Sequence, residues 1–153
     1  MRRIRASLWI CLVFLGLFSA ATATPGQAQP WPGVQGGVSL DPDQVYFGGH
    51  VETSPLIDRL RFRPGLEIGL GDDLTLVAFN FDFTYTFTSS RPWSLFVGGG
   101  PAVNFIDSDG DSDSEGGFNF LLGAKNRDGL FFEMRVGLID SPDLKFGVGF
   151  TFR

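Results

Sequence analysis

The sequence contains few of the residues on which disulfide bonds, thiol chemistry and zinc sites depend. Among its 153 residues there is one cysteine, Cys11, and one histidine, His50. Cys11 lies inside an apolar run near the start of the chain, without the small-residue setting of a lipoprotein site. The chain after residue 28 therefore has no disulfide and no thiol chemistry. Because it also has no Gly-rich phosphate loop, zinc cluster or basic patch, we expect no cofactor.

Long apolar segments are also absent, apart from one near the N-terminus. Three arginines among the first five residues precede an apolar run that ends at residue 18. This run is too short to cross a bilayer as a helix, and small residues follow it. Such a succession is typical of a secretory signal peptide. We predict a signal peptide over residues 1–28, with cleavage after residue 23 as the alternative, and one mature domain over residues 29–153.

Positive charge is scarce in the predicted mature domain. With the three N-terminal arginines removed, nine Lys and Arg residues remain against seventeen Asp and Glu residues. The resulting net charge of about −8 disfavours a nucleic-acid partner.

Aromatic residues and glycine, by contrast, are abundant, with 17 phenylalanines and 21 glycines. Apolar and polar residues alternate in segments that are separated by Asp, Gly, Pro and Ser, which is typical of strands and turns. No amphipathic helix with capping residues is visible, so the predicted class is all-β. The eight predicted strands cover residues 34–40, 45–53, 60–70, 74–87, 93–105, 117–126, 130–138 and 144–152.

One face of nearly every predicted strand is apolar. A closed barrel can direct this face inward, as in a soluble protein, or outward to lipid, as in an outer-membrane barrel. Glycines on the opposite face favour the second solution, since small residues make room in the cramped interior of eight strands. The residues that we expect to face lipid include Phe79, Phe81, Phe83, Phe132, Phe146 and Phe150.

The face opposite the phenylalanines carries charges of both signs in nearly equal number. A narrow barrel interior requires such pairing, because an unpaired buried charge is costly. We therefore predict a closed, eight-stranded, antiparallel up-and-down transmembrane β-barrel with a polar network in its lumen. The predicted network consists of His50, Glu52, Arg61, Arg63, Glu67, Asp82, Lys125, Glu133, Arg135 and Lys145.

Two features need a particular place in this barrel. Pro64 and Pro101 lack the N–H that a strand donates, so we expect them near strand ends or bulges. Residues 106–116 are predicted to form a long acidic loop on the outside, while the shorter turns and both termini face the periplasm. Its carboxylates make it a weak candidate for divalent cations, although the glycine and glutamate of a calcium loop are missing. These carboxylates belong to Asp107, Asp109, Asp111 and Asp113.

The last predicted strand, KFGVGFTF over residues 145–152, resembles the C-terminal assembly signal of small outer-membrane barrels. In this respect the mature chain is similar to the OmpA-like and OmpX-like group, with Phe150 and Phe152 as the signal residues. Arg153 follows Phe152, whereas the signal of the group ends on the aromatic residue. The resemblance implies a monomer in a cell outer membrane, with outer-membrane lipids and the assembly machinery as partners. Despite the porin label of the group, eight strands enclose an interior filled by side chains.

Catalysis has one candidate arrangement, formed by His50, Glu52 and Ser54 on one face of the second strand. Residues spaced in this way rise about 3.3 Å each and lie side by side, so they do not converge as an esterase triad must. We therefore expect a non-enzymatic barrel that contributes to envelope integrity or surface interaction. The alternatives are a lipid A-modifying enzyme of the deacylase or acyltransferase type and a soluble periplasmic lipid-binding barrel.

Overall fold

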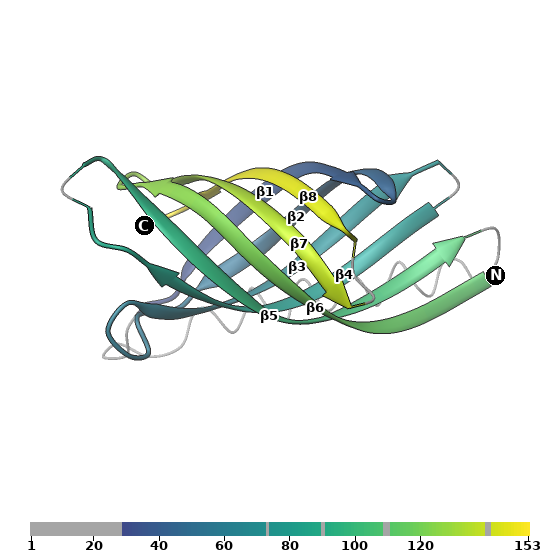
Figure 1. The fold of residues 1–153 in the computed structure, drawn as a ribbon, viewed down its shortest axis with the longest axis horizontal. Helices are drawn as coiled ribbons and strands as arrows, with labels where there is room; N and C mark the ends of the chain where they lie inside the picture. The colour runs from purple at the N-terminus through teal and green to yellow at the C-terminus, as the bar shows by residue number, and fades with distance from the viewer. Residues whose placement is uncertain (1–28, 73, 90, 109–110, 140–141) are drawn as a thin grey trace. The chain divides into compact units, whose positions relative to one another are not determined.

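A computed structural model describes residues 29–153 except residues 73, 90, 109–110 and 140–141. The predicted signal peptide lies outside the described residues. The described chain consists of eight β-strands that follow one another around a closed barrel, each antiparallel to its neighbours (Figure 1). The strands are β1 Trp31–Leu40, β2 Asp43–Glu52, β3 Leu60–Gly71, β4 Leu74–Thr86, β5 Trp93–Ser108, β6 Asp111–Asn126, β7 Leu130–Ile139 and β8 Leu144–Thr151.

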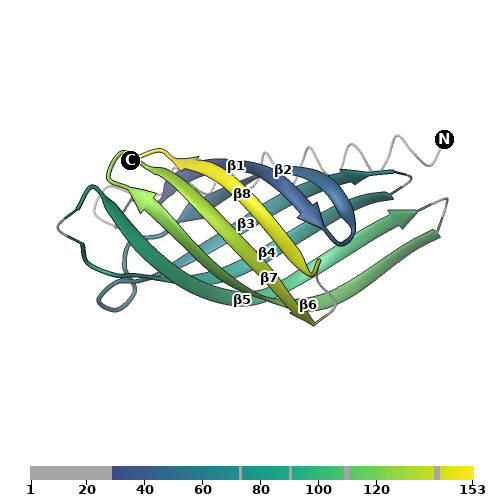
Figure 2. The same cartoon turned by 45° about the horizontal axis from the view of Figure 1, so that its top comes forward.

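The closed antiparallel eight-stranded barrel predicted from the alternation is confirmed. Closure comes from β1, which pairs with β2 on one side and with β8 on the other, for example at Val34 and Phe150. The strands are strongly tilted to the barrel axis (Figure 2). Because every strand has two neighbours, the sheet has no edge strand. None of the described residues forms a helix long and apolar enough to cross a bilayer.

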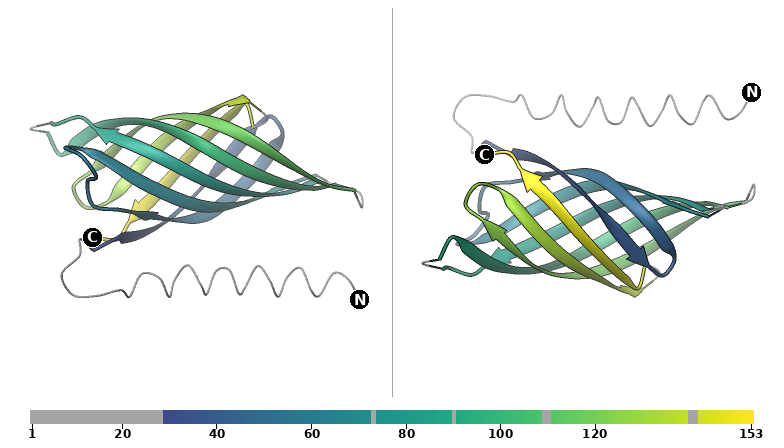
Figure 3. Two further views of the ribbon diagram at one scale, coloured as in Figure 1. Left: turned by 90° about the horizontal axis from the view of Figure 1, so that it is seen from below. Right: turned by 90° about the horizontal axis from the view of Figure 1, so that it is seen from above.

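The acidic segment does not form the predicted long loop. β5 and β6 pair continuously up to Ser108 and Asp111, so most of residues 106–116 belong to a hairpin. This hairpin extends past the other strands at one end of the barrel (Figure 3). Asp and Ser alternate in the described strands of this hairpin, and the sequence between the strands is Asp-Gly, a pair that favours tight turns. The backbone of this segment can therefore keep its β5–β6 hydrogen bonds, although neither face of the hairpin is strongly apolar.

The lengths of the connections between strands also differ from the prediction. At the end that carries the barrel's N- and C-termini, residues 53–59, 87–92 and 127–129 join the strands. At the opposite end only residues 41–42, 72–73, 109–110 and 140–143 lie between strands. The longer connections therefore lie beside the termini, because the acidic segment that was expected to be the longest loop is strand.

The two prolines, predicted near strand ends or bulges, lie inside strands, but each lies where the pairing is interrupted. Pro64 lies inside β3 and Pro101 inside β5, where they pair with Phe81 and Phe118 respectively. On its other side each proline faces a break in the ladder. The β2–β3 pairing ends at Gly65, and the β4–β5 register passes from Ala102 to Gly99 without a pair for Pro101. A strand with two neighbours can lose one donor and stay in place, since the other neighbour still holds it.

The interior is not uniformly polar, because an apolar cluster fills part of it. Phe96, Leu121 and Phe131 are buried together inside the barrel. Glycines make room for the rings: a Cβ at Gly123 would meet the ring of Phe96, and one at Gly149 would meet the ring of Phe131. The sequence signal for this cluster was present but weak, since its members break the polar pattern of the inward face.

Candidate functional site

A central cluster of six charged side chains crosses the middle of the barrel. Arg135 donates to Asp82 at 2.8 Å and to Glu133 at 2.9 Å, and Arg63 donates to the other oxygen of Glu133. Lys145 donates to Glu67 at 2.8 Å. These three carboxylates and three cations, which we call the central cluster, are almost wholly buried. Equal numbers of opposite charges in contact allow the burial, because each charge has a partner that offsets its lost hydration.

A second cluster lies toward the end of the barrel that carries the termini. The carboxylate of Glu52, which is 3% exposed, accepts hydrogen bonds from Lys125 at 3.3 Å and from Arg153 at 3.1 Å. Arg61 lies 3.7 Å from the same carboxylate. We call these four residues the mouth cluster. One carboxylate therefore faces three cations, so the mouth cluster has a formal excess of positive charge.

The ten predicted network residues all lie in the barrel interior, nine of them in the two clusters. The tenth, His50, contacts Thr151 through its Nε2, 3.0 Å from the threonine hydroxyl, and packs edge-on against the ring of Phe131. Arg153 was not among the predicted residues. Its only signal was its position directly after the aromatic residue of the last strand.

The structure does not bring the candidate esterase residues together. His50 and Glu52 face the interior, whereas Ser54 lies beyond the end of β2. His50 Nδ1, which would need a carboxylate partner in a triad, has no hydrogen-bond partner among the described residues. The hydroxyl at His50 Nε2 belongs to Thr151, which is itself buried.

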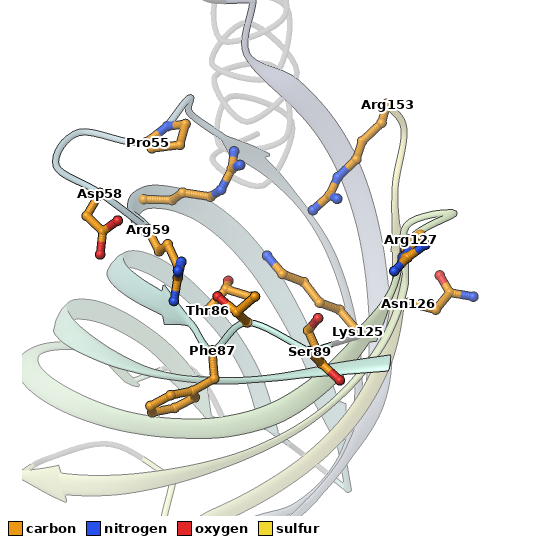
Figure 4. A pocket seen from close by; sticks show the side chains of 13 residues that line it. Pro55, Asp58, Arg59, Thr86, Phe87, Ser89, Lys125, Asn126, Arg127 and Arg153 are labelled. Carbon is orange, nitrogen blue, oxygen red and sulfur yellow. The ribbon is translucent and has the colours of Figure 1, made fainter. Parts of the chain in front are cut away.

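An open cavity lies at this end of the barrel, above the mouth cluster. Its volume is about 250 Å³, and its charged lining residues are Asp58, Arg59, Arg61, Lys125, Arg127 and Arg153. Lys125 and Arg153 project into it from one wall, and Arg59 lies on the wall opposite (Figure 4). Deeper inside, the gap lined by Glu52, Arg63 and Phe96 has no room for a water molecule. The cavity is therefore closed toward the interior of the barrel and does not continue as a channel at this point.

The outer surface of the barrel is apolar. Of the six phenylalanines predicted to face lipid, four are well exposed, for example Phe81 at 40% and Phe132 at 51%. Phe79 and Phe150 also point outward but are half covered by Phe105 and Phe152, whose rings lie 6.0 and 5.2 Å away. The same strands therefore place ion pairs inside and phenylalanines outside.

The acidic residues considered as a weak cation site lie along the β5–β6 hairpin. Asp109 lies outside the described residues. Asp107 pairs with Ser112, and Asp111 and Asp113 pair with Ser108 and Ile106. Within the described part of the chain, no three His, Cys, Asp or Glu side chains are grouped so that they could hold a metal ion.

With this geometry in view, two solved structures share the architecture. The N-terminal β-barrel domain of OprF from Pseudomonas aeruginosa matches with a TM-score of 0.62 and 20% sequence identity, over 84% of this chain and 100% of that one. Neisserial surface protein A (NspA) matches with a TM-score of 0.52 and 16% identity, over 80% of this chain and 94% of that one. The fold is that of these barrels. No family model matches the sequence, and no curated protein does.

Proposed function

We propose that the protein is an exported, non-enzymatic barrel of a bacterial outer membrane that contributes to envelope integrity or surface interaction. The observation that carries this proposal is the inversion of polarity across the barrel wall. Twenty-four large apolar side chains of the described residues are more than a third exposed, while the central cluster is buried inside. A soluble protein seldom exposes so much contiguous apolar surface. A lipid environment turns the same surface into a stable one.

The ends of the barrel fit this location. Aromatic residues are typical of both membrane interfaces. At the end with the termini, Tyr85 packs edge-on against Phe87 at 5.4 Å, and Trp93 stacks on Phe132 at 5.7 Å. We propose that this end faces the periplasm although it carries the longer connections, because the acidic β5–β6 hairpin extends past the other strands at the opposite end and takes the place of the long outer loop. Phe152, which is exposed, and Phe150 would then present the assembly signal, with outer-membrane lipids and the assembly machinery as partners.

The two alternatives require interiors of another kind. A soluble lipid-binding barrel needs apolar side chains around an internal cavity, whereas charged residues and the Phe96 cluster fill this interior. A lipid A-modifying enzyme needs a polar triad open to the outer leaflet, whereas His50 and its partner Thr151 are buried. A filled interior also argues against a role as an open pore.

The test is which face of β4 meets lipid. Phe83 is exposed on the outside, and the adjacent Thr84, with 1% exposure, lies inside. In Phe83→Cys the thiol should react with a lipid-soluble maleimide and resist a membrane-impermeant one, since residues 29–153 contain no other thiol. In Thr84→Cys, the matched control, the thiol should be shielded from the lipid-soluble reagent. Both variants should migrate more slowly on gels after boiling, because a closed barrel resists detergent until it is heated.

The proposal would fail if the impermeant reagent labelled Phe83→Cys freely in membranes. It would also fail if the wild-type protein were recovered from a salt-extractable soluble fraction.

A further inference from the structure

The cavity at the terminal mouth has properties that the barrel itself does not require. Five of its lining residues are cationic, namely Arg59, Arg61, Lys125, Arg127 and Arg153. The carboxylates close to them are those of Asp58, in the lining, of Glu52, beneath it, and of Asp128, which accepts a hydrogen bond from the lining residue Asn126 at 3.4 Å. The described residues around the cavity thus carry a formal excess of two positive charges. The central cluster, with three charges of each sign, leaves no such excess.

Three of the five cationic groups, those of Arg61, Lys125 and Arg153, are held in place by their neighbours. Arg61 donates to the carbonyl oxygen of Thr53 at 3.0 Å, and its guanidinium lies 4.7 Å from the ring centre of Trp31. Arg153 packs on the same ring at 5.4 Å, and the Lys125 ammonium lies 5.7 Å from the ring of Phe96. Aromatic faces attract cations and restrict their motion. The cavity is therefore organised before any ligand arrives.

Neutral polar groups complete the lining. Thr86, Ser89 and Asn126 contribute to the wall, and the buried hydroxyl of Thr86 has no hydrogen-bond partner among the described residues. Guanidinium groups match the geometry of oxyanions, to which they donate two parallel hydrogen bonds.

We propose that this cavity binds a phosphate group, either of a small phosphorylated solute or of a lipid headgroup. A phosphate monoester carries close to two negative charges and a headgroup diester carries one, and both offer more acceptor oxygens to the guanidinium groups than a carboxylate does. The volume of about 250 Å³ is below the range of about 300–1,000 Å³ of pockets for drug-sized ligands and suits a small anion. The proposed site depends only on the structure of the cavity and its lining residues. Only the compartment that it faces, the periplasm, rests on the proposed function.

The charge distribution of the whole barrel supports this assignment. At the opposite end, the described lysine nearest the exposed acidic residues, Lys145, is buried and paired with Glu67. These acidic residues include Asp41, Asp43, Asp72, Asp107, Asp111, Asp113 and Asp143. An anion that approaches the protein is therefore repelled at one end and attracted at the other.

The experiment uses the full exported protein, purified from membranes in a detergent that contains no phosphate. Inorganic phosphate is titrated at low ionic strength by isothermal calorimetry, with chloride as the comparison. We expect binding of phosphate and at least about a tenfold loss of affinity in the double variant Arg59→Gln/Arg127→Gln. Both side chains are exposed and make no ion pair with another described residue, so the barrel should fold normally. Slower gel migration after boiling checks this.

Arg91→Gln is the matched control. Arg91 is an exposed arginine on the connection between β4 and β5, near the same mouth but outside the cavity lining. Its removal should change the phosphate affinity by less than about twofold, as expected for a screened surface charge. The proposal is overturned if wild-type protein does not bind phosphate, or if the double variant and Arg91→Gln lose the same amount.

A second arm separates the two sources of phosphate. The protein is placed in nanodiscs of phosphatidylglycerol or of an uncharged galactolipid, and inorganic phosphate is titrated again. Weaker apparent binding in phosphatidylglycerol would assign the site to a lipid headgroup, which competes with the probe. Equal binding in both would assign it to a soluble phosphate, and either result supports the site. Loss of the outer-membrane location with retained phosphate binding would refute the proposed function and leave this inference standing.

Discussion

The central cluster and the mouth cluster share one interior, but they differ in balance and in access to water. In the central cluster every carboxylate contacts a cation and all six side chains are nearly inaccessible. In the mouth cluster three cations share Glu52, and the side chain of Arg153 is still 29% exposed. Charge that is buried must be matched, whereas charge that borders water can be left in excess. We infer that the first cluster stabilises the barrel and that the second is available to a ligand.

The largest loss of stability is expected for a substitution in the central cluster. Glu133→Gln keeps the shape of the side chain but removes the carboxylate that Arg63 and Arg135 share. Breaking a buried ion pair leaves uncompensated charge, so the free energy of unfolding should fall by about 3–5 kcal/mol. Urea unfolding of the folded barrel in lipid vesicles measures this, and high salt should not reduce the loss, because salt screens buried charges poorly.

Thr84→Val is the control for that variant. Thr84 is buried in the same interior, and its hydroxyl has no hydrogen-bond partner among the described residues. Replacing it by an apolar group of the same shape should alter the free energy of unfolding by less than about 1 kcal/mol. An equal loss in both variants would mean that steric fit, and not charge, dominates the centre.

A smaller effect, with a second consequence of opposite sign, is expected for Glu52→Gln. The variant removes the carboxylate that three cations share, at a cost of about 1.5–3 kcal/mol, typical of hydrogen bonds to charged groups. Added salt should diminish the loss, because these cations border water. The same variant should bind inorganic phosphate more tightly, since it raises the positive excess around the cavity. Tighter binding in a less stable protein separates the ligand role of the mouth from its structural role. Weaker binding would contradict that separation.

The two clusters also differ in how far the sequence predicted them. Alternation with a period of two assigned Arg63, Asp82 and Arg135 to the inward face, and all three lie there. It could not assign partners, because these depend on the tilt and stagger of the strands around the barrel. Arg63 and Glu133, which contact each other, are 70 residues apart in the sequence. The fold was therefore predictable in outline, but the ion pairs were not.

The cationic lining of the cavity could not be predicted from the sequence for a different reason. Arg59 and Arg127 lie on connections and Arg153 at the C-terminus, where no periodicity constrains the direction of a side chain. Only closure of the barrel brings them beside Lys125. The acidic hairpin was missed because its strands lack an apolar face, so the only local signal was the Asp-Gly pair.

The smallest effect on stability is expected for Arg153→Gln. Arg153 is the most exposed member of the mouth cluster, and its contact with Glu52 at 3.1 Å leaves Lys125 and Arg61 to offset that carboxylate. Partly exposed ion pairs contribute little to stability, so the free energy of unfolding, measured in urea, should change by less than about 1 kcal/mol. The affinity for inorganic phosphate should fall by roughly threefold, as one of several cations is removed. Arg91→Gln serves again as the control, because it removes an arginine from the same end but outside the cavity lining. If Arg153→Gln instead unfolds as easily as Glu133→Gln, the mouth cluster is part of the structural core and the contrast between the two clusters fails.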